Sequence, residues 1–117
     1  MYPGNTLIDD LTIYSSSFPR EADNLIAVFQ VMDVGAAGSS VTVKAYTKNS
    51  ADASWPADTN PVGTTATLNT AGDLITLDIT GAVLKEEVRF RFEGTSGTGK
   101  WVHFRLVEMV WYDTAIV

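Results

Sequence analysis

Apolar residues in this chain alternate with polar ones or form short runs, and no segment repeats apolar positions at helical spacing. Clusters of turn-forming residues separate the runs, among them GAAGS at 35–39 and NTAGD at 69–73. The pattern predicts an all-β fold, a single antiparallel β-sandwich with jelly-roll-like topology and about seven to eight strands. Seven runs can be marked, at about 10–16, 24–34, 40–48, 62–69, 73–80, 86–94 and 100–112.

The length of 117 residues fits one domain that can bury its own core, so we assign residues 1–117 to a single β-sandwich domain. Residues 1–10 show little periodicity and contain Pro3 and Gly4. This segment is either an N-terminal arm that becomes ordered on a partner or an ordinary frayed terminus.

The run at 24–34 is apolar on both faces, unlike the other predicted strands. Leu25, Ala27 and Phe29 share one face, whereas Ile26 and Val28 lie on the other. Either this strand is central and covered on its second side, or its second side meets a partner chain.

Basic residues recur on one side of the last two predicted strands. A hairpin centred near Gly97 would place Arg91 opposite His103 and Arg89 opposite Arg105 on one outer face. Either acidic residues on a neighbouring strand, with Asp33 and Asp78 as candidates, neutralise this face, or an acidic partner surface does. A second copy of the acidic chain would also supply the counter-charge, which favours a homo-oligomer.

The strand at 100–112 changes phase near its middle. Leu106 continues the predicted inner face, but Val107, Met109 and Trp111 then take the opposite parity. A β-bulge near Leu106 and Val107 would turn these side chains inward. Without a bulge they would form an outward apolar patch, which is typical of a subunit interface.

The net charge of −6 is unevenly distributed along the chain. Residues 85–105 contain five basic and three acidic residues, a balance of +2, so the remaining residues carry −8. The acidic balance argues against binding to nucleic acid or to an anionic membrane. No apolar stretch approaches the length of a membrane-spanning helix, and the N-terminus shows no signal-peptide pattern.

Catalytic and metal-binding signatures are not apparent. The chain has one histidine, His103, and no cysteine, which excludes a two-histidine metal site, thiolate ligands and disulfides. The segment GTSGTGK at 94–100 lacks phosphate-loop spacing and connects two strands, so it reads as a turn. Acidic residues adjacent in sequence would point to opposite faces of a strand, although a calcium site built from scattered loop acids stays open. We predict a protein without enzymatic activity, cofactor or metal.

Three aromatic residues suggest an alternative function. Tyr46 lies on the polar face of its predicted strand, Trp55 lies in the longest loop, and Trp101 borders the glycine-rich turn. Flat rings beside polar groups bind sugars by stacking, so a carbohydrate-binding β-sandwich module is the second hypothesis. Trp55 would equally well cap one end of the core.

Four segments stand out within residues 23–111: NLIAVFQVMDVG, TVKAYTKNSADASW, VRFRFEGTSG and FRLVEMVW. In this order they resemble small virion proteins of tailed bacteriophages. This likeness implies a capsid decoration (cement) protein or a head–tail accessory subunit that binds the major capsid protein, a tail protein or further copies of itself. It also implies a virion location after synthesis in the host cytoplasm. The residues we expect at the partner surface are Arg89, Arg91, His103, Arg105, Val107, Met109 and Trp111.

Overall fold

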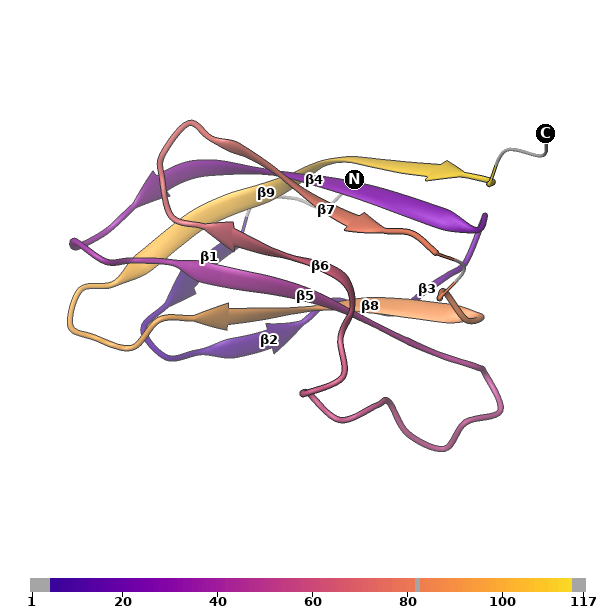
Figure 1. Cartoon of the computed structure of the whole chain (residues 1–117). Helices are drawn as coiled ribbons and strands as arrows, with labels where there is room; N and C mark the ends of the chain where they lie inside the picture. Colours follow the sequence, from indigo (N-terminus) through magenta and orange to yellow (C-terminus); the bar gives the residue numbers. More distant parts are fainter. Residues whose placement is uncertain (1–4, 82, 115–117) are drawn as a thin grey trace.

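The computed structural model describes residues 5–81 and 83–114, which form nine β-strands and no helix (Figure 1). No helix in these two ranges is long and apolar enough to cross a membrane. The strands are β1 (Asn5–Ile8), β2 (Thr12–Tyr14), β3 (Phe18–Pro19), β4 (Asn24–Val34), β5 (Val41–Lys48), β6 (Val62–Leu68), β7 (Leu74–Ile79), β8 (Glu87–Gly94) and β9 (Trp101–Tyr112).

The strands form two antiparallel sheets packed face to face (Figure 1). Sheet A has the order β1-β9-β4-β7, and sheet B has the order β2-β8-β5-β6, with the short β3 pairing β8. The first strands pair with the last in nested order, β1 with β9, β2 with β8, β4 with β7 and β5 with β6. Such a long hairpin rolled into two sheets is a jelly roll, so the predicted β-sandwich is confirmed.

The sequence pattern located most strands but missed two short ones. The seven predicted runs correspond to β2 and β4 to β9, whereas β1 and β3 were not predicted. β1 lies inside the expected N-terminal arm of residues 1–10 and pairs with β9. Residues 1–4 of that arm lie outside the described residues.

The core lies between the two sheets and is built around phenylalanine. Phe29 on β4 is 1% exposed, and its ring stands edge-on to three others. The ring centroids of Phe90, Phe92 and Phe104 lie 5.6, 6.0 and 6.5 Å from that of Phe29. Edge-to-face rings at these separations pack well, and they join β4 and β9 of one sheet to β8 of the other.

β6 of sheet B and β7 of sheet A approach each other closely at Gly63. Gly63 on β6 has a φ of 73°, and a Cβ there would overlap the backbone oxygen of Asp78 on β7. The backbone N–H of Asp78 also donates to Oγ1 of Thr64 at 2.8 Å. Only glycine is compatible with this close contact of β6 and β7. A Cβ at position 63 would clash with the backbone of Asp78, and residues with a Cβ disfavour this positive φ.

β9 contains the expected bulge. Val28 pairs with Glu108 and Phe29 with Leu106, so Val107 is the extra residue on β9. The bulge turns Met109 and Trp111 inward, where both pack against the core. The alternative of an outward patch made by Val107, Met109 and Trp111 is therefore wrong for its last two members.

β4 is a central strand of sheet A, between β9 and β7. Leu25, Ala27 and Phe29 are buried on its inner face, whereas Ile26 and Val28 on the outer face are half-buried. The strand is thus central, as one of the two alternatives predicted, but the described residues do not fully cover its second side.

Candidate functional site

The outward side chains of neighbouring strands meet on sheet B and define the main candidate site. β8 alternates buried and half-buried residues, so Arg89 and Arg91 face outward. Tyr46 on β5 lies opposite Arg89, and Tyr14 on β2 lies opposite Arg91. The register therefore brings two arginines and two tyrosines to one face.

The long loop between β5 and β6, residues 49–61, lies outside sheet B (Figure 1). Asp58 fastens it to the sheet: its backbone oxygen accepts from the Tyr46 hydroxyl at 2.6 Å, and its Oδ1 accepts from the Tyr14 hydroxyl at 3.0 Å. Its Oδ2 lies 3.5 Å from Nη2 of Arg91. We call Tyr14, Trp55, Asp58, Arg89 and Arg91 the Arg89 cluster.

Arg89 lies between two aromatic rings at the centre of this cluster. Its Cζ is 4.1 Å from the ring centroid of Tyr14 and 4.5 Å from that of Trp55. Both distances are typical of cation–π contacts, which hold a planar guanidinium against a ring face. Tyr14 is 41% exposed, so one wall of the site borders solvent.

The cations around Arg89 have acidic partners, but Arg89 does not. Arg91 pairs with Asp58 and Glu93, and Lys48 lies 3.7 Å from Glu87. Within residues 5–81 and 83–114, Arg89 makes no hydrogen bond or ion pair, and its Nε is buried without a partner. No carboxylate of the described residues neutralises the charge of Arg89, so its guanidinium is suited to an anion supplied from outside the chain.

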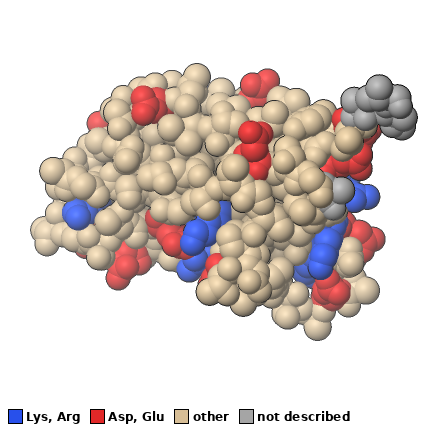
Figure 2. Space-filling view, viewed as in Figure 1, with Lys and Arg blue, Asp and Glu red and all other residues tan. Residues whose placement is uncertain are grey.

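The surface charges agree with this arrangement. In the view of Figure 2, Lys and Arg side chains appear in the middle and lower part, over sheet B and its loops. The upper part of the same view, over sheet A, shows acidic side chains. In this view the basic side chains therefore lie on the sheet B side, where acidic side chains stand next to them.

Tyr46 is buried beneath the loop at 49–61 and holds Asp58 of the Arg89 cluster in place, so it is not a surface ring. Its hydroxyl bonds to the loop backbone at Asp58, and only 1% of the residue is exposed. Burial raises the pKa of the Tyr46 phenol above its usual range, and the nearby charge of Arg91 opposes that shift.

We expect Tyr46→Phe to lower the free energy of unfolding by about 1 kcal/mol at neutral pH, because the bond to Asp58 is lost. Since the folded-state pKa is raised, the contribution of Tyr46 is complete below the unfolded pKa of about 10 and is lost as pH rises through the folded pKa. Urea denaturation of both proteins at neutral and alkaline pH should therefore show a smaller alkaline loss for Tyr46→Phe. Equal losses would contradict this role.

The predicted hairpin between residues 89 and 107 does not form. β8 belongs to sheet B and β9 to sheet A, so the turn at 95–100 crosses from one sheet to the other. Arg89 and Arg91 therefore lie on a different outer face from His103 and Arg105. The expected single row of four basic residues was wrong.

The remaining predicted partner residues lie on β9 and have contacts of their own. Nδ1 of His103 lies 2.7 Å from Oγ1 of Thr6, and Nε of Arg105 donates to Oε1 of Gln30 at 2.9 Å. Neither of the proposed internal neutralisers, Asp33 and Asp78, forms an ion pair with an arginine within the described ranges.

The three predicted sugar-stacking rings do not share a surface. Tyr46 is buried under the loop, Trp55 belongs to the Arg89 cluster, and Trp101 begins β9 in the other sheet. The ring that joins Trp55 is Tyr14, which sequence reasoning missed because its place in the site depends on the pairing of β2 with the distant β8.

In the part of the chain that the structure describes, no three His, Cys, Asp or Glu side chains are grouped so that they could hold a metal ion. No protein-family model matches the sequence, and searches of curated proteins and of solved structures also find no match.

Proposed function

We propose that this protein is a non-enzymatic structural subunit that binds a larger assembly through the Arg89 cluster. The assembly that we propose is the virion of a tailed bacteriophage, where the protein would decorate and stabilise the shell. The resemblance of its segments within residues 23–111 to small virion proteins supports this role. A rigid sandwich with a fixed charged face is suited to such protein–protein contact.

The observation that carries the proposal is the uncompensated charge of Arg89 between Tyr14 and Trp55. Arginine, tyrosine and tryptophan are the residue types that most often dominate binding energy at interfaces. Because the two rings already restrict the guanidinium, a partner carboxylate would bind it at little further cost in side-chain entropy.

We expect Arg89→Glu to weaken attachment to the shell by about 30-fold or more, since an arginine at the centre of an interface contributes about 2 kcal/mol or more. The measurement is co-sedimentation of the purified protein with shells assembled from the major capsid protein of the same virion. Arg105→Glu is the matched control, because it makes the same charge change on the outer face of sheet A.

Arg89→Gln removes the charge without introducing a new one, and thermal unfolding should verify that all three variants keep the fold. Normal attachment of well-folded Arg89→Glu and Arg89→Gln proteins would refute the proposed surface. Loss of attachment only in Arg105→Glu would place the contact on sheet A instead.

Carbohydrate binding is the second candidate, and the pairing of Trp55 with Tyr14 around Arg89 favours it. Two rings beside a guanidinium would suit a sugar that carries a carboxylate. Trp55→Ala should then abolish binding on an array of acidic glycans. An array without hits, together with normal shell attachment, would reject this candidate and leave the first.

A further inference from the structure

One edge of sheet A is only partly covered. β1 pairs with β9 through four positions, from Asn5 opposite Phe104 to Ile8 opposite Trp101. Beyond them, residues 105–112 of β9 pair with β4 on one side and, within the described residues, with no strand on the other. This stretch leaves backbone donors and acceptors free for one more strand, which would lie end to end with β1.

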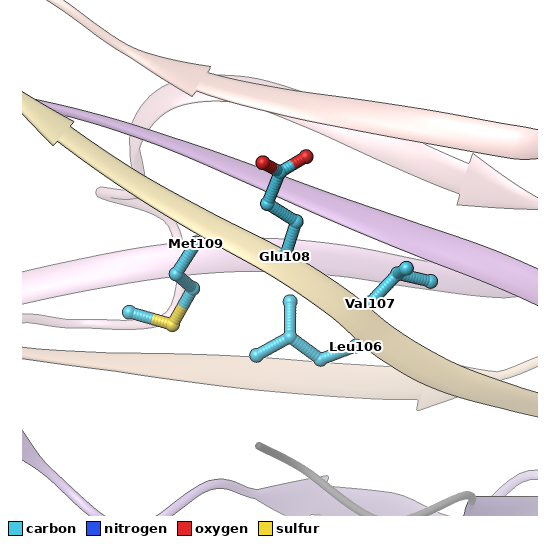
Figure 3. Close-up of a pocket in the computed structure, with 4 residues that line it drawn as sticks. All are labelled: Leu106, Val107, Glu108 and Met109. Carbon is cyan, nitrogen blue, oxygen red and sulfur yellow. The ribbon is translucent and has the colours of Figure 1, made fainter.

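The core is also incompletely covered along this stretch. A pocket of about 380 Å³ lies there, lined by Leu106, Val107, Glu108 and Met109 (Figure 3). Leu106 and Met109 point toward the other sheet, and the two residues between them point away from it. Met109 and Trp111 are only half-buried, although both pack against the core. The three inward side chains at 106, 109 and 111 would therefore gain apolar contacts from a strand that closed this edge.

A regular strand fits this edge despite the bulge at Val107. β4 shows the match on the other side of β9, where residues 27–29 pair without interruption and only Val107 is left out. β4 thereby keeps a simple alternation of inward and outward side chains. A strand at the free edge that leaves out Val107 in the same way would place every second residue opposite Leu106, Met109 and Trp111.

Two of the outward residues on this edge, Arg105 and Glu108, are charged. Arg105 donates to Gln30 and has no acidic partner, and Glu108 has no ion pair, within the described ranges. On an added strand, an acidic residue opposite Arg105 and a basic residue opposite Glu108 would each form a cross-strand ion pair. The edge therefore favours a segment that carries one basic and one acidic outward residue in a fixed order.

The space at this edge limits what can occupy it. An added strand must end beside Arg105, because Asn5 of β1 occupies the next position. The β9 of a second copy does not meet this limit. Even with its Tyr112 opposite Arg105, its Asp113 and Thr114, which continue beside the start of β4, would run into β1. The edge thus suits a segment of about seven residues, one for each of 105–112 except Val107, that ends or turns away at β1.

We propose that this edge binds an extended segment of another protein, which adds a strand to sheet A antiparallel to β9. The segment carries apolar residues at alternate positions, a basic residue opposite Glu108 and, two residues later, an acidic residue opposite Arg105. Backbone hydrogen bonds supply affinity in this mode of recognition, and the alternate side chains supply specificity. The edge lies on the sheet opposite the Arg89 cluster, so the proposal goes beyond the proposed function and does not depend on it.

Two synthetic peptides with blocked ends test the proposal, because they differ only in the order of their charges. TVTVKVE places valines opposite the three inward residues, lysine opposite Glu108 and glutamate opposite Arg105. TVTVEVK exchanges the two charges and so puts like charges opposite each other. In calorimetric titration of the full chain, we expect the second peptide to bind at least about fivefold more weakly than the first.

Arg105→Glu/Glu108→Arg is the matched variant, because it reverses both charges of the edge. Both side chains are exposed, so the variant should keep the fold, which thermal unfolding verifies. It should prefer TVTVEVK over TVTVKVE by a similar factor. Amide hydrogen exchange then locates the bound peptide: we expect slower exchange in residues 105–112 and no change in β7, the opposite edge of the sheet.

Binding of neither peptide at about 1 mM, or equal binding of both peptides by both proteins, would overturn the proposal. Protection at β7 or on sheet B in place of residues 105–112 would do the same. A chain that lacks residues 1–4 should bind TVTVKVE as the full chain does, and binding only after this truncation would assign the edge to the chain's own N-terminus. A dimer by native mass whose residues 105–112 are protected without peptide would assign it to a second copy, and either result refutes the proposal.

Discussion

Phe29→Ala is expected to lower the free energy of unfolding by about 3–5 kcal/mol, the usual cost of emptying a large buried aromatic site. Phe29 contributes both its buried area and three edge-to-face contacts, with Phe90, Phe92 and Phe104. Because these rings come from both sheets, the cavity would weaken the contact between the sheets. Urea denaturation monitored by tryptophan fluorescence measures the change.

Leu74→Ala is a suitable control for this loss. Leu74 is also an apolar residue of sheet A, but it is 62% exposed, so its truncation should change stability by less than about 0.5 kcal/mol. A loss for Phe29→Ala as small as that of the control would mean that the ring cluster does not hold the sheets together.

Gly63→Ala should destabilise the fold by about 3 kcal/mol, through two separate effects. The φ of 73° disfavours any residue with a Cβ by about 1–2 kcal/mol. A methyl group would also lie 2.8 Å from Cγ1 of Ile79 and closer still to the backbone oxygen of Asp78, which forces β6 away from β7. Thermal unfolding and urea denaturation should both report the loss.

Gly72→Ala separates the two effects. Gly72 has a similar positive φ of 91°, but a Cβ there would meet no atom within 4 Å. It should therefore cost only about 1 kcal/mol, from conformation alone. Equal losses at the two glycines would show that the close approach of β6 and β7 is not important for stability.

Strand positions were predictable because alternation is a local property, and the ranges found for β4 to β9 agree closely with the pattern. The pairing of β8 with β9 was not predictable in the same way. A glycine-rich turn such as GTSGTG allows either a hairpin or a crossing between sheets, and its local chemistry does not distinguish them. In this fold β8 pairs with β2 and β5, whose segments lie far away in the sequence.

The candidate site was partly predictable, because some of its residues follow from local alternation along one strand. Arg89 and Arg91 follow from the alternation of one strand, and Trp55 was noticeable as an aromatic residue in a long loop. Their meeting with Tyr14 and Asp58 depends on the docking of residues 49–61 onto sheet B, which no local pattern encodes. The bulge at Val107 was one of the two alternatives that the sequence left open, because Met109 and Trp111 have the opposite parity from the inner face at Leu106.

The nested pairing of the strands affects how the chain can fold. Direct closure of β1 onto β9 would join segments from almost opposite ends of the chain, with the entropy loss of a very long loop. If β5 first pairs with β6, and β4 then with β7, each later closure joins segments that are already near each other. An inside-out order, from the β5–β6 end toward the termini, is thus the least costly route in chain entropy, and it completes sheet A only when the last strand arrives.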